Sequence, residues 1–239
     1  MKYSEIREKY QNHNYVVFVD RYACLISPFI TKILVKTNLT PNMITILMML
    51  SGILGSILFC APNIIVKIVG IVFIHLWYVL DCCDGEIARI KKKYSLFGKE
   101  IDYTAHILNH PFFTIAFCFS MIQLGIYNNI LLMLIFFIII VTNLVFRNIL
   151  MFNSIYETKI LNSDTNEIII NERKKSILSK FVDNIPLYPN FVLTFPIIYV
   201  ISYYLKLNLA YIYVILFMIS SFIIVYLKLL NWIRKIVKL

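Results

Sequence analysis

The chain has 239 residues, of which 60% are hydrophobic and only 15% are charged, with a mean hydropathy of +0.77 and a formal net charge of +10 at pH 7. This balance lies far outside that of soluble domains and excludes a soluble globular protein. The apolar runs are also too long for the alternating strands of an outer-membrane barrel, so we expect an all-α integral membrane protein.

The N-terminal part is expected to lie at the membrane surface. An apolar run at 16–36 is interrupted by the charged residues Asp20, Arg21 and Lys32. Charged side chains are costly in a lipid-facing span, so this run is predicted to be an amphipathic helix lying in the interface. A seventh span is the alternative, because long basic side chains can reach the headgroups. Residues 1–41 are therefore assigned to a cytosolic and interfacial segment.

Six later runs are long and apolar enough to cross a bilayer as helices. They cover residues 43–61, 64–80, 107–127, 130–151, 191–205 and 209–227. The second span is predicted to continue as a helix through Ile90, and the third helix to begin near Lys99. The whole chain, 1–239, is thus expected to be one domain with a six-helix core at 42–230 and a cytosolic loop at 153–186.

The positions of the basic residues predict the orientation in the membrane. With six spans and both termini on one side, every Lys and Arg except Lys67 and Lys206 falls on the side of the termini. Basic segments stay in the cytoplasm, so that side is predicted to be cytosolic and the protein to lie in the cytoplasmic inner membrane. Nothing in the sequence indicates a module that binds nucleic acid.

The stretch after the second apolar run is unusually polar. On a continuous helix, Asp81, Asp84, Gly85 and Ala88 share one face. Two carboxylates so close repel each other unless a cation neutralises them, and oxygen ligands favour Mg2+ or Mn2+. The bare backbone at Gly85 would let a bulky ligand approach the helix. Arg89 adds a charge suited to phosphate.

A second polar face is predicted on the next helix. It carries Asp102, His106 and His110 at helical spacing, with Asn109 beside them. A helical hairpin would bring this face towards Asp81, and ionisable groups at such depth indicate a functional site. A solvated interfacial loop, in which the charges only stop the spans, is the alternative interpretation.

Zinc bound by Cys82, Cys83 and His106 is a further alternative. It is disfavoured because adjacent cysteines on a helix point in different directions and the neighbouring ligands are carboxylates.

The polar stretch resembles a known signature. The segment DCCDGEIAR at 81–89, followed by Gly98 and Asp102, is similar to the pattern D-x-x-D-G-x-x-A-R-x8-G-x3-D-x3-D of the CDP-alcohol phosphatidyltransferase family. Every specified position matches except the last, where His106 replaces Asp. Upstream, NLTPNMIT at 38–45 resembles the polar segment that opens this family's first span. The interfacial helix and six spans also match the family's architecture.

The resemblance implies an activity. It is the metal-dependent transfer of a substituted phosphate from a CDP-linked donor to the hydroxyl of an acceptor alcohol, with release of CMP. The donor would be CDP-diacylglycerol or a soluble CDP-polyol or CDP-amino-alcohol, and the acceptor a lipid or a small polar alcohol. Such an enzyme would serve phospholipid or surface-glycolipid synthesis. Two Mg2+ or Mn2+ ions, contact with membrane lipids and a homodimer are expected with it.

Site residues are carried over by position in the motif. The metal ligands implied are Asp81, Asp84, Asp102 and, in place of the fourth Asp, His106. The CDP moiety would be contacted by Gly85, Ala88, Arg89, Gly98, Ser95, Pro41 and Asn42. His106 would also be the catalytic base, since a neutral imidazole can accept a proton. The alternatives are a base elsewhere, either His110 or a water held by Asn109, and an inactive member of the family.

Two other classes of function are considered. One is a membrane scaffold that retains an inactive site. The other is a cation or solute transporter that uses Asp81, Asp84 and Asp102 as its pathway. Transporters of this size usually contain inverted repeats or interrupted helices in matching halves, and we find neither in the sequence.

Overall fold

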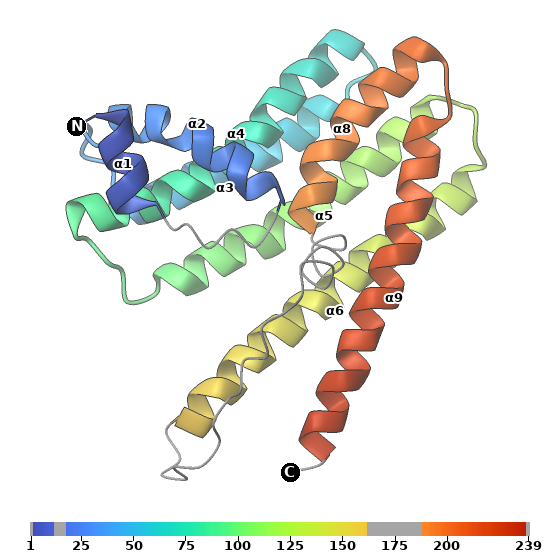
Figure 1. Ribbon diagram of the computed structural model, residues 1–239. Coiled ribbons are helices and arrows are strands. Elements are labelled where there is room, and N and C mark those ends of the chain that lie inside the picture. The colour runs from blue at the N-terminus through green and yellow to red at the C-terminus, as the bar shows by residue number, and fades with distance from the viewer. Residues whose placement is uncertain (1, 12–17, 162–187, 238–239) are drawn as a thin grey trace.

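The computed structural model of the protein describes residues 2–11, 18–161 and 188–237, and these residues form helices and short connections without any strand (Figure 1). The helices in chain order are α1 (Tyr3–Tyr10), α2 (Phe18–Leu34), α3 (Pro41–Phe59), α4 (Ile64–Lys91), α5 (Gly98–Gln123), α6 (Asn129–Leu161), α8 (Tyr188–Leu205) and α9 (Leu209–Val237). The predicted all-α class is confirmed.

Six helices in the described part of the chain, namely α3, α4, α5, α6, α8 and α9, are long and apolar enough to cross a membrane. The six predicted spans are therefore confirmed, and they indicate a multi-pass membrane protein. As expected, α4 runs on to Lys91 and α5 begins near Lys99, at Gly98. Helix α6 continues to Leu161, into the segment predicted as a cytosolic loop at 153–186, while its candidate span ends at Asn153. The rest of that loop lies outside the described residues.

The N-terminal helices lie together at one end of the bundle, where both contact α4 (Figure 1). Helix α2 is not among the six candidate spans. Its Ser27 and Thr31 are fully buried, whereas Phe29 and Ile33 on another face are 61% and 67% exposed. An exposed apolar face is what a helix lying in the membrane interface presents to lipid. The short charged helix α1 was not anticipated from the sequence.

Helices α3 and α4 pack more extensively than any other pair in the described part of the chain, and α3 packs next most extensively on α5. Gly55 and Gly70 face each other across the first contact: a Cβ on Gly70 would lie 2.8 Å from Gly55 O and 2.8 Å from Phe59 N. Small residues let membrane helices approach closely. The close approach at this end aligns α3 with the polar part of α4 at the other end.

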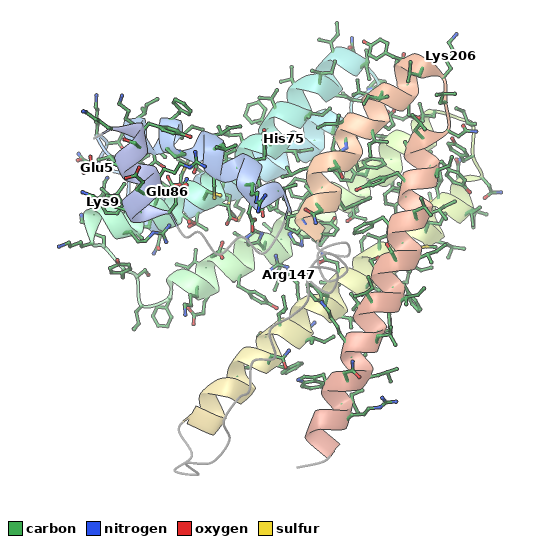
Figure 2. All side chains as sticks on the ribbon, viewed as in Figure 1. Glu5, Lys9, His75, Glu86, Arg147 and Lys206 are labelled. Atoms are coloured by element: carbon green, nitrogen blue, oxygen red, sulfur yellow. The ribbon has the colours of Figure 1, made fainter. Side chains whose placement is uncertain are left out.

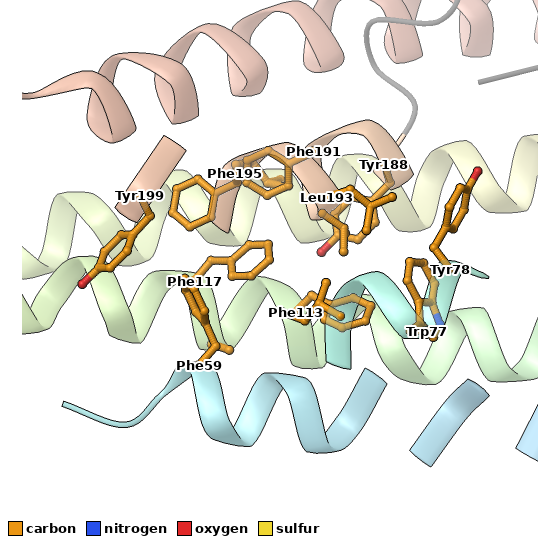
Figure 3. Packing of buried hydrophobic residues seen from close by; sticks show 14 of the residues in the cluster. Phe59, Trp77, Tyr78, Phe113, Phe117, Tyr188, Phe191, Leu193, Phe195 and Tyr199 are labelled. Atoms are coloured by element: carbon orange, nitrogen blue, oxygen red, sulfur yellow. The ribbon is translucent and has the colours of Figure 1, made fainter. Parts of the chain in front are cut away.

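Aromatic side chains hold α8 against α5 (Figure 3). Phe117 of α5 packs against Phe195 of α8, with ring centroids 4.7 Å apart, and against Phe59 of α3 at 5.3 Å. Phe113 and Phe191 are also fully buried in this cluster. Buried rings contribute large contact areas, so this cluster fixes the central spans relative to one another.

Lys67, one of the two basic residues predicted to face away from the polar motif, lies at the opposite end of α4 and is only 2% exposed. Its Nζ donates to Phe59 O at 2.8 Å, Ser120 Oγ at 2.8 Å and Gln123 Oε1 at 3.0 Å. A buried ammonium needs such partners. Lys67 therefore joins the end of α3 to α5.

Gly70→Ala is expected to destabilise the bundle, because the added methyl would collide with backbone atoms of α3, which cannot move aside on their own. Overpacking of this kind costs about 1–3 kcal/mol, so the thermal midpoint of the purified protein in detergent should fall by several degrees. The control is Gly98→Ala, whose Cβ would lie 3.5 Å from Ser95 Cβ, an ordinary contact. Equal midpoints for Gly70→Ala and wild type would contradict the close packing.

Candidate active site

The polar ends of α3, α4 and α5 meet at one end of the bundle, which we call the motif end. Helix α4 ends where Lys92 takes a left-handed conformation, with φ of 52°. Just before it, Lys91 Nζ donates to Thr37 O at 2.7 Å and to Leu39 O at 2.9 Å. These bonds tie the segment that precedes α3 to the end of α4.

Three of the predicted ligands face one another across the hairpin of α4 and α5. One ligand atom from each of Asp81, Asp102 and His106 lies within 4.8 Å of the others. His106 Nε2 is 3.3 Å from Asp81 Oδ1 and 3.4 Å from Asp102 Oδ1. The imidazole is mostly buried, while the side chains of Asp81 and Asp102 are 25% and 42% exposed. The histidine of the cluster is therefore buried in the protein, whereas the two carboxylates are partly accessible from outside.

The donor set of this cluster fits a divalent cation. Asp102 Oδ1 is buried and accepts no hydrogen bond, although buried polar atoms normally have a partner. Two carboxylates and one imidazole, with one ligand atom of each converging, are ligands that Mn2+ and later metals accept readily and Mg2+ accepts through the oxygens. Trp77 packs edge-on against the His106 ring at 5.4 Å, which holds Nε2 towards the carboxylates.

Asp84 is held separately, one turn further along α4. Its Oδ2 accepts a hydrogen bond from Thr45 Oγ1 of α3 at 2.7 Å. Sequence reasoning missed Thr45, although it lies one turn after Pro41 in the polar segment that opens α3. The carboxylate of Asp84 thus faces the junction of α3 and α4, beside the cluster formed by Asp81 and Asp102.

The residues predicted to contact a nucleotide are gathered at the motif end. Pro41 and Gly98 begin α3 and α5, and Asn42 Nδ2 donates to Ser95 Oγ at 3.1 Å across the two segments. On α4, Gly85, Ala88 and Arg89 follow Asp84. The Arg89 guanidinium lies over Gly85, where a Cβ would be 3.3 Å from Nη1.

The two alternative candidates for a base are engaged in packing. His110 is 2% exposed, with Nδ1 2.9 Å from Asn143 Nδ2 and Nε2 3.4 Å from Arg147 Nη2. Asn109 is fully buried and, with its amide oriented to satisfy both neighbours, donates to Met49 O at 3.1 Å and accepts from Trp77 Nε1 at 2.9 Å. Both residues thus join helices.

Arg147 of α6 is a site residue that sequence reasoning missed. Its guanidinium lies 5.5 Å from the centre of the Tyr103 ring and interacts electrostatically with Asp102 and Asp81 (Figure 2). An arginine within an apolar span is costly and was the available signal. It therefore brings a positive charge into the neighbourhood of the two carboxylates.

The cysteines face a different helix. Cys82 Sγ lies 3.9 Å from Cys24 Sγ, and Cys83 Sγ donates to Ser27 O at 3.6 Å, so both thiols point towards α2. The zinc alternative with His106 has no support in this geometry.

The structure is that of a six-span membrane protein. It has a cluster of two carboxylates and one histidine between the facing sides of α4 and α5, and these two features define its class. The family model for CDP-alcohol phosphatidyltransferase matches residues 38–182, which is more than half of the chain and includes the whole cluster. The chain belongs to this family, and membership implies transfer of a phosphate group from a CDP-alcohol to an acceptor. A search of the curated proteins found no match.

Asp102→Asn is expected to weaken Mn2+ binding about 10-fold or more, because it removes a charged oxygen ligand from the cluster. Titration of the purified protein with Mn2+, followed by the EPR signal of the free ion, measures the change. The control is Glu100→Gln, which removes an exposed carboxylate from the same helix outside the cluster. Equal losses in the two variants would show that only the general negative charge matters.

Proposed function

We propose that the protein is an active, metal-dependent CDP-alcohol phosphotransferase in which His106 replaces the family's fourth carboxylate. One observation carries this proposal: Asp81 of α4 converges with Asp102 and His106 of α5 to within 4.8 Å. An inactive member of the family would be under no constraint to keep these atoms together. The competing functions, a membrane scaffold and a cation or solute transporter, are tested by the assay below.

The metal site would be formed by the carboxylates of Asp81, Asp84 and Asp102, with Mg2+ or Mn2+ bound and His106 beside them in the cluster, and two ions fit the number of carboxylates. When bound, the metal would neutralise the pyrophosphate and stabilise the charge on the departing CMP. The carboxylates of Asp81 and Asp102 are exposed on one side, where a donor can reach them. Thr45 would keep Asp84 in place through its hydrogen bond.

The CDP moiety would be bound by the residues gathered at the motif end, which are Gly85, Ala88, Arg89, Gly98, Ser95, Pro41 and Asn42. Helices α3 and α5 both begin here, and the N-terminus of a helix attracts phosphate through its free N–H groups and its dipole. Arg89 supplies a full positive charge beside them. A donor bound in this position would have its phosphates next to Asp81 and Asp84.

His106 would accept the proton from the attacking hydroxyl at Nε2. This nitrogen faces Asp81 and Asp102 at 3.3 and 3.4 Å, so both carboxylates would stabilise the imidazolium that forms. Nε2 cannot hold a metal and accept a proton at the same moment. We therefore assign Nε2 to the proton during transfer and the metal to the carboxylates.

The proposed acceptor and the proposed orientation in the membrane are both argued from positively charged residues. Arg147 is a charged neighbour of Asp102 and would suit an acceptor that carries a phosphate or carboxylate. The basic residues around α4 and α5 favour a motif end that faces the cytosol, in the cytoplasmic membrane. We propose that the protein acts as a homodimer in the synthesis of phospholipid or surface glycolipid. Its donor would be CDP-diacylglycerol or a soluble CDP-alcohol.

The test is release of CMP by the protein purified in detergent. CDP-diacylglycerol, CDP-ethanolamine, CDP-glycerol and CDP-inositol are each supplied with Mg2+ or Mn2+ and a crude lipid acceptor. Wild type should release CMP from at least one donor, and His106→Ala should reduce turnover about 100-fold or more, as loss of a general base does. His106→Asp should restore part of it.

Two results would contradict these assignments. Undiminished turnover in His106→Ala would remove the base assignment, and a large loss of Mn2+ affinity in that variant would make His106 a ligand instead. Folded wild-type protein that releases no CMP from any donor would favour the scaffold or the transporter.

A further inference from the structure

A buried carboxylate that is not among the predicted site residues lies beside the candidate active site. Glu86 of α4 is 1% exposed and occupies an unspecified position of the motif (Figure 2). Its Oε1 accepts from Gln11 Nε2 at 2.8 Å and from Ser27 Oγ at 2.5 Å. Its Oε2 accepts from Thr31 Oγ1 at 2.5 Å. All three donors come from the N-terminal segment.

These bonds make a specific anchor. A buried carboxylate is costly unless its oxygens receive hydrogen bonds, and bonds to a charged acceptor are about twice as strong as neutral ones. Gln11 is itself buried and donates also to Cys24 O at 2.6 Å, so its side chain joins the end of α1 to both α2 and α4. The end of α1 therefore has one defined position on α4.

That position also determines the conformation of Arg89. The residue before Gln11 is Tyr10, and its carbonyl oxygen accepts a hydrogen bond from Arg89 Nε. The guanidinium then lies over Gly85, with its two terminal nitrogens 3.3 and 3.4 Å from where a Cβ would be. Neighbouring residues of the N-terminal segment thus contact Glu86 and Arg89, one turn apart on α4.

We propose that Glu86 and Gln11 are positioning residues for the donor site: Gln11, anchored on Glu86, sets the Tyr10 carbonyl that holds the Arg89 guanidinium over Gly85. The inference rests on the proposed function, in which Arg89 binds the CDP moiety. Gln11, Ser27 and Thr31 precede the family match, which begins at residue 38. The N-terminal segment would therefore complete a nucleotide site that the family region alone leaves unfinished.

The expected benefit is pre-organisation. A free arginine side chain loses conformational entropy when it binds phosphate, and a guanidinium that is already oriented loses less. Removing the anchor should weaken nucleotide binding without changing the cation cluster at Asp81 and Asp102. Nucleotide binding should weaken in this way only in protein that retains Arg89.

A double-mutant cycle on the full chain tests this, with CDP as the probe and its Kd measured by calorimetry in the presence of Mn2+. Gln11→Ala should weaken CDP binding about 5-fold, the effect of freeing one long side chain. In an Arg89→Ala background, Gln11→Ala should cause no further loss. Glu86→Gln, which removes the charge and replaces one acceptor oxygen by an NH2 group that faces the donors, should weaken CDP binding in the same direction, and it too should cause no further loss in the Arg89→Ala background.

The matched control is Glu5→Ala, which breaks only the Glu5–Lys9 pair on α1, where the side chains are 39% and 66% exposed (Figure 2). It should leave the Kd unchanged. Equal losses from Gln11→Ala with and without Arg89, or no loss at all, would overturn the inference. Wild-type protein that binds Mn2+ but no CDP would overturn the proposed function itself, before any variant is compared.

Discussion

Three carboxylates on α4 impose the constraint on which the motif end depends. Asp81, Asp84 and Glu86 lie within two turns of a mostly apolar helix, where an uncompensated negative charge is very costly. Each is compensated by a different part of the chain: His106 of α5 lies against Asp81, Thr45 of α3 donates to Asp84, and the N-terminal segment donates to Glu86. The arrangement of four helices around α4 follows from these pairings.

The remainder of the bundle makes those pairings possible. Gly55 and Gly70 let α3 and α4 approach closely, and the aromatic cluster around Phe117 keeps α8 against α5. Lys67 closes the opposite end with three hydrogen bonds. Because these contacts are rigid, the side chains at the motif end can be held in defined positions rather than moving with the surface.

His106 places an imidazole in one cluster with the carboxylates of Asp81 and Asp102. Its Nε2 faces the two carboxylates, and Trp77 packs edge-on against its ring. An imidazole in this position can share a metal or accept a proton. Arg147 comes from α6 and adds a positive charge near Asp102 and Asp81.

The sequence by itself determined the class, the six spans and the two polar helix faces, because apolar length and helical spacing are local properties. Tertiary structure decided which groups meet. The contact of Thr45 with Asp84, the burial of His110 against Asn143 and the anchoring of Gln11 on Glu86 join residues far apart in the chain. Such contacts depend on how each helix is rotated and how deeply it packs, and no periodicity within a single helix contains that information.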